Sequence, residues 1–124
     1  RSLARAWQDY YGGGHNSGRL DAYGDLLEKL VRGELLSARS TAYLRGVMER
    51  VVTGPNRLKA GLPAGVRLAH KTGTQRERTC DGGVVRVPAG GNARAAPSER
   101  DPQVVIVACV SGPPPRGPSV PVRC

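Results

Sequence analysis

The chain has 124 residues, which suffices for one small domain and leaves little room for two. Leu, Val, Ile and Phe supply only 26 of these residues, so the composition supports a modest hydrophobic core and excludes a large one. The formal net charge is +9, and arginine carries most of it, because only three residues are lysine. The arginines are scattered along the chain with few aromatic residues, which argues against a nucleic-acid interface built on base stacking.

Helical spacing of apolar residues predicts three helices in the first half of the chain. Gly33 suits the C-terminal exit of the second helix, because glycine readily adopts positive φ. The third helix has the clearest apolar stripe, which we interpret as core: Leu44, Val47, Met48, Val51 and Val52. The predicted helices cover residues 1–11, residues 21–32, and a third span that is capped by Ser37 or Ser40 and stops at Gly54 and Pro55.

The second half of the chain is predicted to form β-strands. Alternation predicts a half-exposed strand over 66–72, a short strand is expected over 83–87, and the apolar run 103–110 is typical of a strand buried on both faces. The expected fold is therefore α+β, with helices packed on an antiparallel three-stranded sheet. The composition of residues 89–102 predicts a long loop. The predicted domain covers residues 1–111, and the proline-rich residues 112–124 are predicted to form a disordered tail.

The cysteines and histidines do not form a metal-binding pattern. There is no C-x-x-C spacing, and His15 lies far from His70, so neither a metal nor another cofactor is expected. Pairing of Cys80 with Cys109 is left open, because a strand cysteine such as Cys109 is more often a small buried apolar residue. No secretory signal peptide and no apolar run long enough to cross a membrane is found in this sequence.

The stretch 66–74 carries the strongest functional signal. A strand ends there in Lys71, Thr72 and Gly73, followed by Thr74. An ammonium supplies charge, a hydroxyl supplies a hydrogen bond, and glycine lets a ligand approach the backbone. This combination favours a site for an anion.

The order of the surrounding segments makes this signal more specific. A helix leads into Thr53-Gly54, the loop A-G-L-P-A-G follows at 60–65, and K-T-G-T follows at 71–74. In this order the segments resemble the C-terminal part of a class A serine β-lactamase or a close penicillin-binding relative, over about residues 37–110. The resemblance implies a β-lactam hydrolase that works through an acyl-enzyme.

The resemblance also implies roles for individual residues. Lys71 would attract the substrate carboxylate, Thr72 would donate its hydroxyl to it, and Gly73 would keep the strand edge open. The backbone N–H of Thr74 would be one of two oxyanion-hole donors. Two arginines, Arg76 and Arg78, would add positive potential nearby.

Three motifs of such an enzyme are missing from this sequence: S-x-x-K, S-D-N and E-x-x-x-N. We therefore expect a partial enzyme, inactive alone, that binds a β-lactam or a peptidoglycan-like ligand. Its expected partners are a complementary N-terminal chain that supplies the serine, or a second copy through the strand 103–110, whose edge would be left unpaired. An intact relative would be periplasmic or secreted. The alternative function is a basic module that binds nucleic acid or anionic surfaces.

Overall fold

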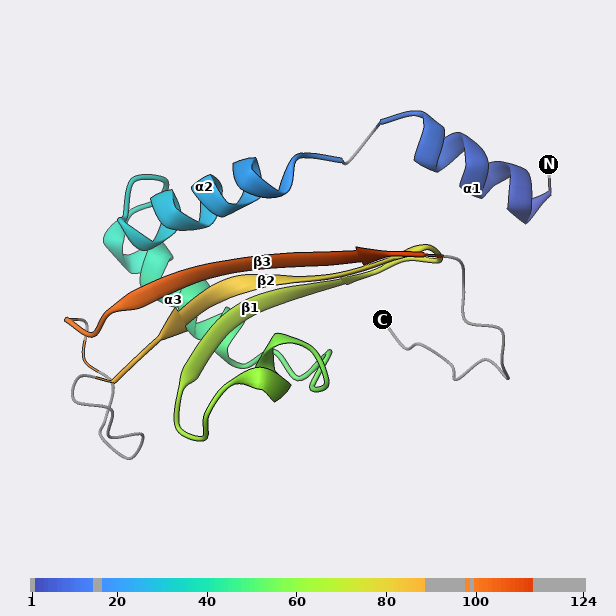
Figure 1. Cartoon of the computed structure of the whole chain (residues 1–124). Helices are drawn as coiled ribbons and strands as arrows, with labels where there is room; N and C mark the ends of the chain where they lie inside the picture. The colour runs from blue at the N-terminus through green and yellow to red at the C-terminus, as the bar shows by residue number, and fades with distance from the viewer. Residues whose placement is uncertain (1, 15–16, 89–97, 99, 113–124) are drawn as a thin grey trace.

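The computed structural model describes residues 2–14, 17–88, 98 and 100–112, and it has the predicted α+β architecture (Figure 1). His15, most of the predicted loop 89–102 and the tail 113–124 lie outside these residues. Among the described helices, none combines the length and hydropathy of a membrane span. The elements in chain order are α1 Leu3–Gly12, α2 Leu20–Val31, α3 Ala38–Glu49, the 3-10 helix η1 Leu58–Gly61, β1 Arg67–Thr74, β2 Arg78–Arg86 and β3 Gln103–Ser111.

Local backbone and capping contacts explain where α2 ends and where α3 begins and ends. The Ser37 hydroxyl accepts a hydrogen bond from the Ser40 backbone N–H at 3.2 Å, so Ser37 is the N-cap of α3. Gly33 follows α2 with φ 73°, as predicted from the sequence. The last turn of α3 tightens, because the Val51 N–H bonds to the Met48 carbonyl. The helix therefore ends at Glu49, and the predicted extension of its apolar stripe to Val52 is wrong, since Val52 is 85% exposed.

The sheet is antiparallel, with the strand order β1-β2-β3. Its register places Lys71 opposite Gly82, and Thr72 opposite Asp81. Because β2 lies in the centre, its residues 81–85 are all buried. β2 begins at Arg78, five residues before the predicted start, and its first half forms the hairpin with the end of β1.

Both longer helices pack on one face of the sheet, where the hydrophobic core lies. α2 contacts β3 and β2, and α3 contacts β1. The core is small, as the composition suggests, and its buried members are Leu27, Leu30, Met48, Ala69 and Val84. Burying a residue of this kind contributes about 1.5–3 kcal/mol, so each of the larger members matters to stability.

Burial of the outer strands differs from the sequence-based expectation. β3 was expected to be buried on both faces, but it lies at the edge of the sheet, with Val104 49% and Val110 72% exposed. β1 was expected to be half-exposed, yet Leu68, Ala69 and His70 are all buried. Both strands lie at an edge of the sheet, so their burial depends on which segments pack against each of them, and the hydropathy pattern alone does not report this.

α1 contacts the turn between β1 and β2 through its aromatic side chains. The Tyr10 hydroxyl accepts a hydrogen bond from Gln75 Nε2 at 2.9 Å, and the Tyr11 hydroxyl accepts one from the Glu77 backbone N–H at 3.3 Å. The Trp7 ring stacks on Tyr11, with 5.7 Å between ring centroids. α1 has no buried residue, so these contacts provide its attachment.

We expect Gly83→Ala to destabilise the fold by about 1–3 kcal/mol, because overpacking forces the surrounding atoms to move. A Cβ at Gly83 would lie 2.2 Å from the Ala69 carbonyl oxygen, which is backbone of β1. Urea denaturation measures the change. Gly24→Ala is the control, since a Cβ there meets nothing within 4 Å and alanine favours a helix. Equal midpoints for the Gly83 variant and the parent would contradict the close pairing of β1 and β2.

Candidate functional site

The predicted anion site lies at the C-terminal end of β1. Lys71 is exposed, and its ammonium donates a hydrogen bond to the Thr72 carbonyl. Thr72 is buried, and its hydroxyl lies 2.6 Å from the hydroxyl of Thr53. Gly54 approaches the same threonine closely, because a Cβ on Gly54 would lie 2.8 Å from Thr72 Cγ2. The chain at 53–54 thus holds the Thr72 side chain in one orientation.

A groove of about 710 Å³ opens beside this strand end. It lies between the N-terminal half of α2 and the sheet, and the ring of Tyr23 covers Gly82 so closely that a Cβ there would lie 2.6 Å from the ring. Burial, and then the nearby charge of Asp81, raise the pKa of the Tyr23 phenol above its ordinary value. The groove is lined by Ser17, Gly18, Arg19, Leu20, Ala22, Tyr23, Leu26, Lys71, Thr72, Gly73, Gln75, Arg78, Cys80, Asp81, Gly82, Val107, Cys109 and Ser111.

The structure brings together four of the six predicted site residues. Three consecutive residues of β1 line the groove with Arg78: Lys71, Thr72 and Gly73. Thr74 is half-buried and does not line it, and Arg76 lines a different cavity of about 380 Å³ with Trp7 and Tyr11 of α1. A third cavity, of about 470 Å³, lies at the other end of β1 beside Lys59. Positive side chains from β1 and β2 therefore meet in one concave surface.

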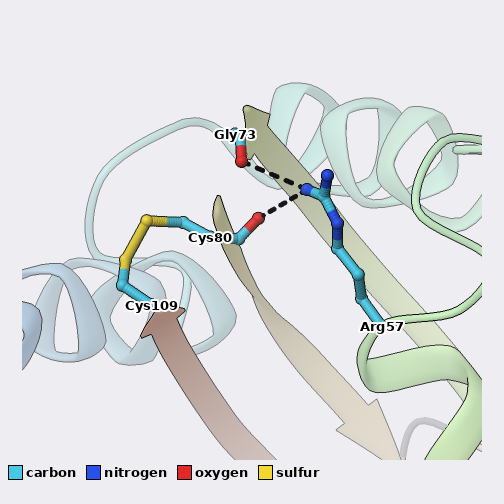
Figure 2. Close-up of a disulfide and its surroundings, with 4 residues drawn as sticks. All are labelled: Arg57, Gly73, Cys80 and Cys109. Carbon is cyan, nitrogen blue, oxygen red and sulfur yellow. Dashed lines mark hydrogen bonds between the residues drawn. A yellow bond between two sulfur atoms is a disulfide. The ribbon is translucent and has the colours of Figure 1, made fainter. Parts of the chain in front are cut away.

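Arg57 is a further residue at this strand end, which the sequence motifs did not single out. It is half-buried, and Figure 2 shows its guanidinium reaching two carbonyl oxygens, those of Gly73 at 3.1 Å and Cys80 at 2.9 Å. Its other terminal nitrogen, Nη2, donates to the Thr74 hydroxyl at 2.6 Å. The planar fork of arginine matches several acceptors at once, so Arg57 ties the end of β1 to β2.

A buried polar pair lies directly before Lys71. His70 is 1% exposed, and its Nδ1 lies 2.8 Å from Oδ1 of Asp81, which is 3% exposed. An ionised carboxylate only accepts hydrogen bonds, so Nδ1 of His70 carries the hydrogen when Asp81 is charged. Oδ2 of Asp81 has no hydrogen-bond partner among the described residues. The hydrogen bond to His70 therefore holds the Asp81 side chain in place, at the position opposite Thr72 in the register.

The groove also contains a disulfide that the sequence analysis left open. Cys80 and Cys109 are opposite one another in register and are bonded (Figure 2). Cys109 was expected to be a small buried apolar residue, but it is exposed and joined to β2. Its position near the end of the edge strand explains the exposure. The third cysteine, Cys124, lies outside the described residues.

No group of three side chains able to hold a metal ion comes together within the described part of the chain. The polar lining of the groove is mainly cationic side chains, hydroxyls and backbone groups, with Asp81 as its carboxylate. Such groups recognise an anion, and the apolar wall made by Leu20, Tyr23 and Leu26 suits an apolar substituent on the same ligand.

The profile of the β-lactamase enzyme family matches residues 8–96, well over half of the sequence. The chain belongs to the β-lactamase enzyme family. This confirms the resemblance that the ordered segments indicated. The match includes 71–74 and Arg57, and it extends upstream of residue 37, where the sequence resemblance faded.

Individual relatives agree with the family. The chain is 40% identical over 72 residues to the extended-spectrum β-lactamase PER-1 of Pseudomonas aeruginosa, and 38% identical over 65 residues to β-lactamase VEB-1 of the same organism. These matches cover 53% and 48% of this chain, but only 23% and 22% of the relatives. The chain thus spans about a quarter of the length of these curated β-lactamases.

Solved structures give the same fold. The TLA-1 extended-spectrum β-lactamase superposes with a TM-score of 0.64 at 30% identity, covering 81% of this chain and 38% of that one. PBP-A superposes with a TM-score of 0.58 at 35% identity, covering 71% of this chain and 29% of that one. The three helices and three strands therefore correspond to one part of a β-lactamase fold.

We expect Arg57→Lys to destabilise the chain by about 1–2 kcal/mol, because a lysine cannot replace three hydrogen bonds from one planar group. Amide hydrogen exchange of residues 73–80 should accelerate at the same time. Arg76→Lys is the matched control, since Arg76 is exposed. Unchanged exchange in the Arg57 variant would show that Arg57 does not hold the two strands together.

Proposed function

We propose that this chain carries the carboxylate-recognition part of a β-lactam-binding site. The observation that carries the proposal is the meeting of Lys71, Thr72 and Arg78 along one groove with an apolar wall. β-Lactams join a carboxylate to an apolar substituent, and this groove offers complementary groups for both. Family membership supports the same ligand class, since PBP-A has been solved as an acyl-enzyme complex with penicillin G.

Each residue has a distinct role in this proposal. Lys71 and Arg78 attract the carboxylate, and neither forms an ion pair among the described residues. The hydroxyls of Thr53 and Thr72 share one hydrogen bond, in which one donates and the other accepts. The accepting hydroxyl keeps its own hydrogen, which it can donate to the ligand. Arg57 positions the residues after Gly73, because it binds both the Gly73 carbonyl and the Thr74 hydroxyl.

The backbone of β1 supplies the proposed oxyanion donor. β1 pairs with β2 along one edge only. Every second backbone N–H of β1 therefore points away from β2 and takes no part in the hydrogen bonds between the two strands. The N–H of Thr74 would stabilise the negative charge that develops on the β-lactam carbonyl oxygen. Removing one donor from such a site costs about 2.7–4 kcal/mol, so a second donor has to complete it.

Hydrolysis also needs a nucleophile that this sequence does not contain as S-x-x-K. We propose that a complementary segment of the same family supplies the serine and the second oxyanion donor. The free edge of β3, with Val104 and Val110 exposed, is where this segment or a second copy of the chain would add a strand. Alone, the chain binds the ligand without hydrolysing it.

Lys71→Ala should weaken binding of benzylpenicillin by about tenfold at low ionic strength, because one charge-assisted contact to the carboxylate is lost. Amide chemical shifts of residues 71–75 report the binding. Lys59→Ala is the control with the same charge change, since Lys59 lines the cavity at the other end of β1. A penicillin titration that shifts residues 59–68 instead would refute the proposed groove.

Mixing the chain with a β-lactamase fragment that contains S-x-x-K should produce hydrolysis of a chromogenic β-lactam that neither part shows alone. The serine forms the acyl-enzyme, and this chain supplies the carboxylate contacts and an oxyanion donor. The same mixture made with the Lys71→Ala chain should be slower. Hydrolysis by the isolated chain, or a mixture that is equally active with Lys71→Ala, would contradict this division of roles.

A further inference from the structure

The disulfide between Cys80 and Cys109 lies inside the groove rather than in the core. Both residues line the groove together with Lys71 and Arg78. The two cysteines face each other across β2 and β3, with 4.1 Å between their Cα atoms. A Cβ added to Gly73 would lie 3.7 Å from Cys80 Cβ, so the disulfide sits beside the proposed ligand site.

The two cysteines of the bridge differ in accessibility. Cys109 is exposed, on the edge strand of the sheet, whereas Cys80 is half-buried on the central strand. The backbone of Cys80 is also restrained, because its carbonyl accepts a hydrogen bond from Arg57 Nη1 at 2.9 Å (Figure 2). A reagent in the groove therefore reaches the Cys109 sulfur more easily, and access is one of the factors that sets exchange rates.

The charged groups that line the groove give it a positive potential. Asp81 is the carboxylate of the lining and is hydrogen-bonded to His70. Arg19 is paired with Asp21, so Lys71 and Arg78 leave the lining with an excess of cations. Lys71 and Arg78 have no ion pair among the described residues, and the Arg78 guanidinium instead lies 5.3 Å from the centre of the Tyr11 ring. A cleft lined by one sign of charge concentrates ligands of the opposite sign.

We propose that the Cys80–Cys109 disulfide is a thiol-exchange site that selects negatively charged low-molecular-weight thiols, with Cys109 as the sulfur that is attacked. The two cationic side chains bring the anionic thiol to the disulfide and stabilise the thiolate that leaves. This inference goes beyond the proposed function, because it concerns a reaction of the groove that needs neither a β-lactam nor a serine.

The exchange balances without any other oxidant or reductant. The thiolate of the reagent attacks the sulfur of Cys109, a new sulfur–sulfur bond forms between them, and the Cys80–Cys109 bond breaks. The electron pair of that bond leaves on the sulfur of Cys80, which takes a proton from water. A second reagent thiol can then release Cys109 and leave as the oxidised reagent, so that the protein disulfide is reduced.

The test treats the 124-residue chain with small thiols that differ in charge. In a Cys124→Ser background, the oxidised protein reacts with glutathione, which is anionic, 2-mercaptoethanol, which is neutral, and cysteamine, which is cationic. Iodoacetamide traps the released thiol, and mass spectrometry gives the rate and the position of each adduct. Rates are divided by the reactivity of each thiol with 2-hydroxyethyl disulfide, which removes intrinsic differences in nucleophilicity.

The corrected rate should be about tenfold higher for glutathione than for cysteamine at low ionic strength, with 2-mercaptoethanol between them. The ratio of the corrected rates for glutathione and cysteamine should fall towards one in about 0.5 M salt. Peptide mapping should place glutathione on Cys109 and the carbamidomethyl group on Cys80. Equal corrected rates, glutathione on Cys80, or no adduct would each overturn the proposal.

A pair of arginine variants separates the groove from the net charge of the protein. Arg78→Gln should lower the preference for glutathione, whereas Arg76→Gln, with the same charge change, should leave it unaltered because Arg76 lines another cavity. An equal effect of both variants would overturn the role of the groove. If Arg78→Gln does not fold, the salt series and the adduct positions on the parent chain still decide the question.

Discussion

The pairing of β1 with β2 is the constraint on which the site depends. It places Lys71 opposite Gly82 and Gly73 opposite Cys80, so a slip of one residue would turn every side chain of β1 to the other face. Close approach at Gly83 and the buried bond between His70 and Asp81 both favour this register. The polar pair contributes specificity as much as stability, because an unpaired buried carboxylate in any other register would be costly.

Contacts from three other segments shape the groove at the C-terminal end of β1. Arg57 binds its carbonyl and hydroxyl oxygens, Thr53 orients Thr72, and the disulfide joins β2 to β3 alongside. The remaining wall comes from α2, which packs on the sheet through Leu27 and Leu30. In the proposed division of roles, this part of the β-lactamase fold recognises the anion and a complementary segment supplies the nucleophile.

Patterns that depend on neighbours in the chain were predictable from the sequence. The three helices, the Ser37 cap and the Gly33 exit all follow from local spacing. The predicted end of the strand at Gly73 is wrong, because β1 continues through Gly73 to Thr74. Features that depend on contacts between distant segments were not predictable. Arg57 lies 16 residues before Gly73, and nothing in its loop distinguishes it from the exposed Lys59. Likewise, the composition of β3 does not show that Val104 and Val110 are exposed, because exposure depends on which segments pack against the strand.

The attachment of α1 has a consequence for observing the molecule in solution. Trp7 is the single tryptophan of the chain, and it stacks on the tyrosine whose hydroxyl binds the backbone of Glu77. That backbone belongs to the short connection between the strands that carry Lys71 and Arg78. The intrinsic fluorescence of this one indole therefore originates next to the hairpin tip, and it offers an optical signal from that region without any added label.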